Sequence, residues 1–160
     1  MPISFLKRLN LSKRFEIFLP LHWRSAPVLA GTHDVGVYGE WVAQSFLKSQ
    51  GYKILVQNYT ASWGKDPSEA GEIDITCRHE NTLVFVEVKT RTGTLFERPA
   101  LSVDATKQRK LIRTAHEYLK ELRLGEEIAT RFDIVEIHLA PHQKPVCTIL
   151  PAAFGINKRV

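Results

Sequence analysis

The sequence predicts an α/β protein in which a mixed β-sheet is flanked by helices. Two long segments carry apolar residues at helical spacing, several short segments carry strand patterns, and the two kinds alternate along the chain. The expected order is α, β, β, β, α, β, β. A chain of 160 residues that is 44% hydrophobic and 24% charged can bury the core of one globular domain.

Two helices are predicted, over residues 37–50 and 102–123. In the first helix, apolar side chains recur at helical spacing, at Val42, Ala43, Phe46 and Leu47. Gly51 supplies the residue type that commonly ends a helix. The second helix has a longer apolar stripe, formed by Leu111, Ile112, Ala115, Leu119 and Leu122. Both helices are therefore expected to pack on the sheet.

Strand patterns occupy most of the remaining chain. The predicted strands are residues 52–58, 72–78, 83–90, 131–139 and, as an edge strand, 146–150. Residues 60–71 contain Gly64, Pro67 and Ser68 and are predicted to form a surface loop.

The strands at 72–78 and 83–90 are predicted to form a hairpin. A tight turn centred between Glu80 and Asn81 would pair residues whose numbers sum to 161, so Asp74 would stand opposite Glu87. The same register places Glu72 opposite Lys89. One face of the hairpin is then apolar throughout, and its members are Ile73, Ile75, Cys77, Val84, Val86 and Val88.

The first 35 residues lack this periodicity and contain Pro20, Pro27 and Gly31. We expect residues 1–35 to form an amino-terminal extension, either flexible or folded as a short amphipathic helix, and residues 36–155 to form the domain. No apolar run approaches the length of a membrane span, and the start of the chain is interrupted by charges, so we expect neither a membrane partner nor a secretory signal.

The two cysteines, Cys77 and Cys147, lie in apolar segments without a second cysteine or a histidine at zinc-ligand spacing. A reducing, cytoplasmic location is therefore expected. The net charge of +5 is concentrated locally, because residues 89–113 hold seven basic side chains against Glu97 and Asp104. A basic segment of this kind favours a nucleic-acid partner, although a solvated helix face would have the same composition.

The predicted pairing of Asp74 with Glu87 is the main indication of chemistry. Like charges directly opposite one another destabilise a sheet, and a hard divalent cation such as Mg²⁺ or Mn²⁺ would offset the repulsion. Lys89 follows Glu87 by two residues, so its ammonium would project from the same face toward an attacking water or a phosphate. These three residues form a coherent hydrolytic set.

Two further residues are candidates for the same site. Glu40 begins the first helix and leans toward its packed side, where a site carboxylate and a simple first-turn acid are equally good readings. Lys107 stands in the first turn of the second helix, where the helix dipole disfavours a cation, and a phosphate contact would explain it. Glu72 is ambiguous because it is also placed to pair with Lys89 across the hairpin.

Four motifs together resemble the YraN family of small bacterial proteins. They are GVYGE at residues 36–40, GEID at 71–74, FVEVKTR at 85–91 and RFD at 131–133. That family is similar to a branch of the PD-(D/E)xK nucleases, akin to archaeal Holliday-junction resolvases and restriction endonucleases. The resemblance covers about residues 36–140, and it implies a restriction-endonuclease-like fold with an α-β-β-β-α-β core.

The resemblance also implies roles for individual residues. Asp74 and Glu87 would bind Mg²⁺ or Mn²⁺, Lys89 would orient or activate water, and Glu40 would be an additional carboxylate of the catalytic and metal-binding set. Nucleic acid would be bound by the basic side chains Arg91, Lys107, Arg109, Lys110 and Arg113. This sequence differs from the family in its long amino-terminal extension and in a longer loop before Gly71.

The expected function is metal-dependent endonucleolytic hydrolysis of phosphodiester bonds, in DNA in preference to RNA, with structured or branched DNA as candidate substrates. A homodimer is one expectation, because junction-cutting enzymes act as dimers. Two alternatives remain open: a nucleic-acid-binding module without catalysis, and an adaptor that binds a protein partner through residues 1–35.

Overall fold

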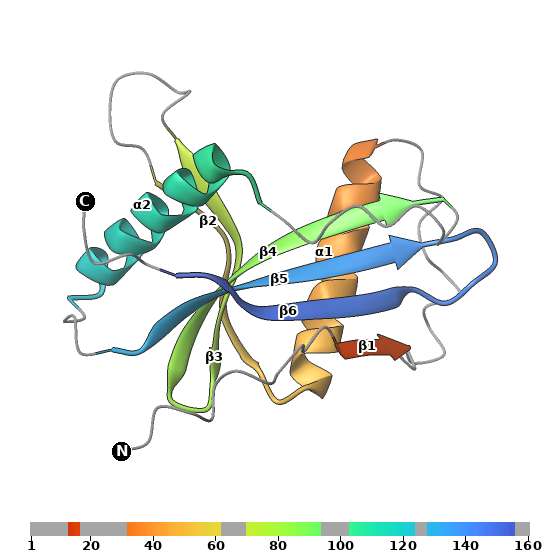
Figure 1. The fold of residues 1–160 in the computed structure, drawn as a ribbon, viewed down its shortest axis with the longest axis horizontal. Coiled ribbons are helices and arrows are strands. Elements are labelled where there is room, and N and C mark those ends of the chain that lie inside the picture. Colours follow the sequence, from red (N-terminus) through yellow and green to blue (C-terminus); the bar gives the residue numbers. More distant parts are fainter. Residues whose placement is uncertain (1–12, 17–31, 62–69, 94–102, 124–127, 156–160) are drawn as a thin grey trace, which may run out of the picture.

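The computed structural model describes residues 13–16, 32–61, 70–93, 103–123 and 128–155, which form a six-stranded sheet with one helix on each face (Figure 1). The strand order is β1-β6-β5-β4-β3-β2. The helices are α1 (Thr32–Ser49) and α2 (Ala105–Glu121). The strands are β1 (Lys13–Glu16), β2 (Lys53–Ala61), β3 (Gly71–His79), β4 (Thr82–Thr92), β5 (Thr130–Leu139) and β6 (Val146–Phe154).

This arrangement confirms the predicted fold class, a mixed α/β sheet flanked by helices and consistent with a restriction-endonuclease-like fold. The sheet is mixed because α2 carries the chain from β4 to β5, which run parallel, whereas the other neighbouring strands run antiparallel. No helix in the described ranges is long and apolar enough to cross a membrane.

Several boundaries differ from the sequence prediction. Helix α1 begins at Thr32, five residues before the predicted start, although Gly36 and Gly39 lower the helical propensity of its first turns. Strands β2 and β6 extend to Ala61 and Phe154, beyond their apolar segments. Within the predicted extension, Lys13–Glu16 pairs with β6, while residues 1–12 and 17–31 lie outside the described part of the chain.

Each helix covers its own apolar core. The core on the α1 face includes Phe46 and Leu47 of the helix together with Val84, Val86 and Val135 of the sheet. The core on the α2 face is formed by Leu111, Ala115 and Tyr118 of the helix and by sheet residues that include Phe85, Phe132 and Ile134. Strands β4 and β5 are therefore buried on both faces, which explains their nearly continuous apolar sequence.

The β3–β4 hairpin has the predicted register from His79↔Thr82 to Ile75↔Val86. The prediction that Ile73 shares the apolar face of Ile75 is wrong, because Ile75 packs in the α1-side core and Ile73 in the α2-side core. Regular alternation would put both on one face, so β3 must rotate about its axis at Asp74, the residue between them. The strand pairing ends at this point.

A close contact between Gly39 and Thr90 seats α1 on β4. A Cβ atom added to Gly39 would lie 1.8 Å from Thr90 Oγ1 and 2.9 Å from Thr90 Cβ. Because the second distance involves a backbone-attached carbon, rotation of the threonine side chain would not relieve the overlap. Glycine is thus required at position 39, directly before Glu40.

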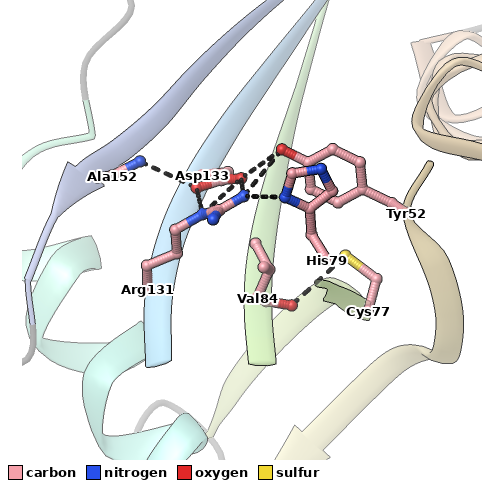
Figure 2. Close-up of polar contacts among 7 residues, drawn as sticks. All are labelled: Tyr52, Cys77, His79, Val84, Arg131, Asp133 and Ala152. Carbon is pink, nitrogen blue, oxygen red and sulfur yellow. Dashed lines mark hydrogen bonds and ion pairs between the residues drawn. The ribbon is translucent and has the colours of Figure 1, made fainter. Parts of the chain in front are cut away.

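A buried polar cluster ties β3, β5 and β6 to the segment between α1 and β2 (Figure 2). Asp133 of β5 is fully buried, and its carboxylate accepts hydrogen bonds from Arg131 Nε at 2.9 Å, Tyr52 Oη at 3.1 Å and Ala152 N at 2.9 Å. Arg131 also contacts His79 Nδ1 at 3.3 Å. Asp133 is therefore a hydrogen-bonding residue within β5, with both carboxylate oxygens engaged by the fold.

Replacing Gly39 by alanine should destabilise the fold and displace α1 from β4. Overpacking of this kind typically costs about 1–3 kcal/mol, and we expect about 2 kcal/mol for Gly39→Ala. The measurement is the free energy of unfolding from urea titrations followed by circular dichroism.

Gly36→Ala is the matched control, because a Cβ at Gly36 would meet nothing within 4 Å. Alanine there should leave stability unchanged or raise it by up to about 1 kcal/mol, as expected from helix propensity. Equal effects of the two substitutions would contradict a specific contact between Gly39 and Thr90.

Candidate functional site

Asp74 and Glu87 lie where the ladder between β3 and β4 ends. The last pair of the register is Ile75↔Val86, and the next residue on each strand is Asp74 or Glu87. Beyond this point the Val88 N–H donates to Asp74 Oδ2 at 2.6 Å. The Asp74 side chain therefore accepts a hydrogen bond from a backbone N–H group of β4. The carboxylates of Asp74 and Glu87 lie where the backbone pairing of the two strands ends.

The surroundings of Asp74 disfavour its ionised form. Burial, together with the negative charges of Glu87 and Glu40, raises the pKa of Asp74 to about 7. The Val88 N–H and the Lys107 ammonium act in the opposite direction. Ionising this carboxyl in the isolated protein therefore costs free energy.

Glu87 is the most deeply buried carboxylate of the site, with 4% of its side chain exposed. Its Oε1 accepts a hydrogen bond from Lys89 Nζ at 2.8 Å and lies 3.2 Å from Lys107 Nζ. Its Oε2 is buried and has no hydrogen-bond partner within the described residues. Because buried carboxylate oxygens are nearly always satisfied in folded proteins, this oxygen is available to a ligand.

The two lysines approach Glu87 from different elements. Lys89 follows Glu87 by two residues on β4, so its side chain leaves the same face of the strand. Lys107 lies in the first turn of α2, whose N-cap Asp104 accepts from the backbone N–H groups of Thr106 and Lys107, both at 2.9 Å. The N-cap fixes the turn that delivers Lys107 to the carboxylate.

Glu40 belongs to the same electrostatic cluster. It is half-buried on α1, and its charge contributes to the raised pKa of Asp74. Its Oε2 accepts a hydrogen bond from Asn58 Nδ2 at 3.3 Å. The prediction that Glu40 lies in the first turn of its helix is wrong, because α1 begins at Thr32 and Glu40 is in its middle. The contact with Asn58 orients the Glu40 carboxylate.

Asn58 is a site residue that the sequence analysis did not identify. Its neighbours Gln57 and Tyr59 pair with Ile75 and Ile73, so Asn58 stands level with Asp74 on the adjacent strand. Its φ of 51° is a left-handed conformation that asparagine adopts more readily than most residues. An asparagine inside a strand pattern was the available signal, but the strand was predicted to end there.

The predicted nucleic-acid-binding residues lie on β4 and on α2. Arg91 is 3.9 Å from Glu136 of β5, and Arg109 donates to Thr106 Oγ1 at 3.0 Å on the exposed side of α2. Lys110 and Arg113 follow on the same helix, half-buried and exposed respectively. Within this set, Lys107 contacts a site carboxylate, that of Glu87.

The residues present fit a hard divalent cation. No group of three His, Cys, Asp or Glu side chains that could hold a metal occurs among the described residues. However, Mg²⁺ and Mn²⁺ are commonly held by one or two carboxylates, with water and substrate phosphate completing the coordination. The unpartnered Glu87 Oε2 beside the destabilised Asp74 carboxylate meets this requirement.

Comparison with known proteins places these residues in a family. The model of the uncharacterised protein family UPF0102 matches residues 39–137, a range that contains all six site residues. The chain is 38% identical over 109 residues to the UPF0102 protein of Caldanaerobacter subterraneus, which covers 68% of this chain and 83% of that relative.

Two other UPF0102 relatives align over more of the chain. The protein of Syntrophotalea carbinolica is 37% identical over 124 residues, covering 78% of this chain and 94% of the relative. The protein of Symbiobacterium thermophilum is 40% identical over 121 residues, covering 75% and 95%. The chain therefore belongs to UPF0102, the YraN family, which is a PD-(D/E)xK-like nuclease family.

Proposed function

We propose that this protein is a Mg²⁺- or Mn²⁺-dependent endonuclease that hydrolyses phosphodiester bonds, in DNA in preference to RNA. The observation that carries the proposal is the buried, unpartnered Oε2 of Glu87 next to Asp74, whose pKa is raised to about 7. A site in which one carboxylate oxygen lacks a partner and a neighbouring carboxyl resists ionisation is complementary to a cation.

This arrangement is costly to the isolated fold, and simple structural roles do not account for it. A buried polar atom without a hydrogen bond costs about 1–3 kcal/mol, and repulsion between neighbouring carboxylates adds to that cost. A bound cation would remove both penalties. We therefore assign Asp74 and Glu87 as metal ligands, with Glu40 as a further carboxylate of the set whose charge acts on Asp74.

The proposed reaction is in-line hydrolysis, in which a water oxygen forms a bond to phosphorus and the bond from phosphorus to the leaving sugar oxygen breaks. A bound divalent cation supplies Lewis-acid polarisation of the phosphate and lowers the pKa of water. Lys89, held 2.8 Å from Glu87 Oε1, is placed to orient the attacking water or to neutralise charge on the phosphate. Asn58 positions Glu40 through its hydrogen bond.

The basic residues of α2 supply the proposed contact with the nucleic-acid backbone. Arg109, Lys110 and Arg113 continue along the helix from Lys107, so they would hold phosphates near the carboxylate pair. DNA is favoured over RNA because the fold is consistent with that of restriction endonucleases and junction resolvases. The same reasoning makes branched DNA and a homodimer the first cases to test.

The first prediction concerns cleavage of a labelled DNA panel that contains duplex, single-strand, flap and four-way-junction substrates. The wild-type protein should cut at least one substrate in Mg²⁺ or Mn²⁺ and none in EDTA. The double variant Asp74→Ala, Glu87→Ala should lose at least about 10²-fold of the rate, because both metal ligands are removed. Products are quantified on denaturing gels.

Glu72→Gln is the matched control for this experiment. Glu72 is an exposed carboxylate on β3 whose backbone pairs with Thr60 of β2, so its loss should change the cleavage rate less than about twofold. Binding of DNA without cutting, equal in wild type and double variant, would replace the endonuclease with a non-catalytic binding module. Failure to bind any nucleic acid would favour a protein-binding adaptor.

The second prediction uses the raised pKa of Asp74. Its pKa is about 7 in the folded protein against 3.8 for an ordinary aspartate, so the folded state holds this proton more tightly than the unfolded state. The resulting destabilisation is absent below about pH 4, grows with rising pH, and is complete above about pH 7. In EDTA, Asp74→Asn should therefore stabilise the protein by about 2 kcal/mol at pH 8 and by less at pH 5.

Urea unfolding at the two pH values measures this difference. Asparagine retains an oxygen that can accept from Val88 N, so the backbone contact is conserved in the variant. Added Mg²⁺ at pH 8 should stabilise the wild type more than Asp74→Asn. A variant that is less stable than the wild type at pH 8 would show that Asp74 is a structural residue.

The third prediction concerns the salt dependence of DNA binding. Each lost phosphate contact lowers the slope of log Kd against log salt by about 0.9, so Arg109→Ala and Arg113→Ala should each weaken binding and reduce the slope by about that amount. Fluorescence anisotropy in EDTA, with no cleavage, measures both quantities.

Lys120→Ala provides the control on the same helix. Lys120 is 78% exposed, pairs with Glu117 at 3.5 Å, and lies 13 residues beyond Lys107, or about 20 Å along the axis. An unchanged slope in the two arginine variants, or an equal loss in Lys120→Ala, would exclude the first turns of α2 as the DNA contact.

A further inference from the structure

Two ammonium groups share one oxygen of Glu87. Lys89 Nζ is 2.8 Å and Lys107 Nζ is 3.2 Å from Glu87 Oε1, while Glu87 Oε2 has no partner among the residues that the structure describes. The two cations are therefore gathered on one side of the carboxylate. Both positive charges therefore act on Glu87, and that of Lys107 acts on Asp74 as well.

The two lysines differ in how firmly they are held. Lys89 comes from β4 itself, two residues from Glu87, and its side chain is 29% exposed. Lys107 comes from α2, the helix that packs on this face of the sheet, and its side chain is 38% exposed. It also lies at the positive end of the α2 dipole, where a cation is disfavoured. Its position is thus maintained by the carboxylates rather than by its own helix.

A divalent cation bound by Glu87 would stand beside this ammonium. The bound cation and the Lys107 ammonium would both lie against the same carboxylate, and like charges repel strongly in a partly buried site. Glu87 would also no longer need the lysine to balance its charge. A long, half-exposed lysine side chain can rotate away from the carboxylate at little cost. The cation and Lys107 are therefore competitors for the negative charge of Glu87.

We propose that Lys107 is a resident counter-cation of the carboxylate pair, which a divalent metal ion displaces and thereby releases toward the substrate phosphate. The inference rests on the proposed metal-dependent function and adds an exchange step to it. Before metal binding, the Lys107 ammonium lies 3.2 Å from Glu87 Oε1 and balances the negative charge of that carboxylate. After metal binding, the same ammonium becomes available to the nucleic acid, so metal loading prepares the site for its substrate.

The test is the affinity of the full-length protein for Mn²⁺, measured by isothermal titration calorimetry without nucleic acid. Lys107→Met removes the competing charge and should tighten Mn²⁺ binding about five- to tenfold, the size expected for a partly exposed ion pair. The titration is run at pH 8.5, so that Asp74 is ionised in both proteins, and at 0.15 M salt, which screens distant charges.

Arg109→Met is the matched control. It removes one positive charge from the same part of α2, but the Arg109 guanidinium contacts Thr106 and not Glu87. It should change Mn²⁺ affinity less than twofold. Equal or weaker Mn²⁺ binding by Lys107→Met would overturn the exchange step and leave the nuclease proposal intact, whereas no Mn²⁺ binding by the wild type would overturn both.

A second measurement needs no variant and so does not depend on one that folds. Labelling the wild type briefly with an amine-reactive ester, followed by mass spectrometry, reports how accessible each lysine is. Mg²⁺ should raise the labelling of Lys107 at least about threefold, because the ion pair that protects it is broken. Lys120 should not respond. Unchanged or reduced labelling of Lys107 would contradict its release.

Discussion

The site depends on holding a buried carboxylate, that of Glu87, and a half-buried one, that of Asp74, together at the point where the β3–β4 pairing ends. A regular hairpin would continue to pair backbone groups beyond Ile75 and Val86, but here Asp74 accepts the Val88 N–H with its side chain. This hydrogen bond keeps the Asp74 carboxylate directed toward β4, and it replaces the regular backbone pairing between β3 and β4. The rotation of β3 at Asp74, which sends Ile73 and Ile75 to different cores, follows from the same departure.

The two helices complete this centre from opposite faces of the sheet. On one face, the absence of a side chain at Gly39 lets α1 approach Thr90 closely, and the next residue, Glu40, is carried to the carboxylate pair. On the other face, the capped first turn of α2 delivers Lys107 to Glu87. A negative group and a positive group thus enter from separate layers, and neither could reach the centre if its helix were displaced by one turn.

Sequence alone predicted the parts of this centre that depend on local rules. The turn between Glu80 and Asn81 fixes the hairpin register, and two-residue spacing places Lys89 beside Glu87. The sequence patterns did not predict the features that depend on contacts between distant parts of the chain. The rotation at Asp74 reflects competition between a side-chain carboxylate and the ladder, which period-two patterning does not represent. The role of Asn58 depends on α1 and β2 meeting across 18 residues, and β1 is a strand only because β6 offers it an edge.

The two buried acidic clusters of the sheet show why one is structural and the other is a candidate for chemistry. Asp133 lies on the α1 face, and both of its oxygens accept hydrogen bonds, from Arg131, Tyr52 and Ala152 (Figure 2). Glu87 follows Val86, the β4 residue that pairs with Asp133, and its side chain lies on the α2 face. One oxygen of Glu87 has no hydrogen-bond partner among the described residues. Both acids are buried to a similar degree, so burial does not separate them. What separates them is the completeness of their hydrogen bonding. A closed network such as that of Asp133 stabilises the protein by itself, whereas the described residues leave one oxygen of Glu87 without a hydrogen bond and so open to a ligand.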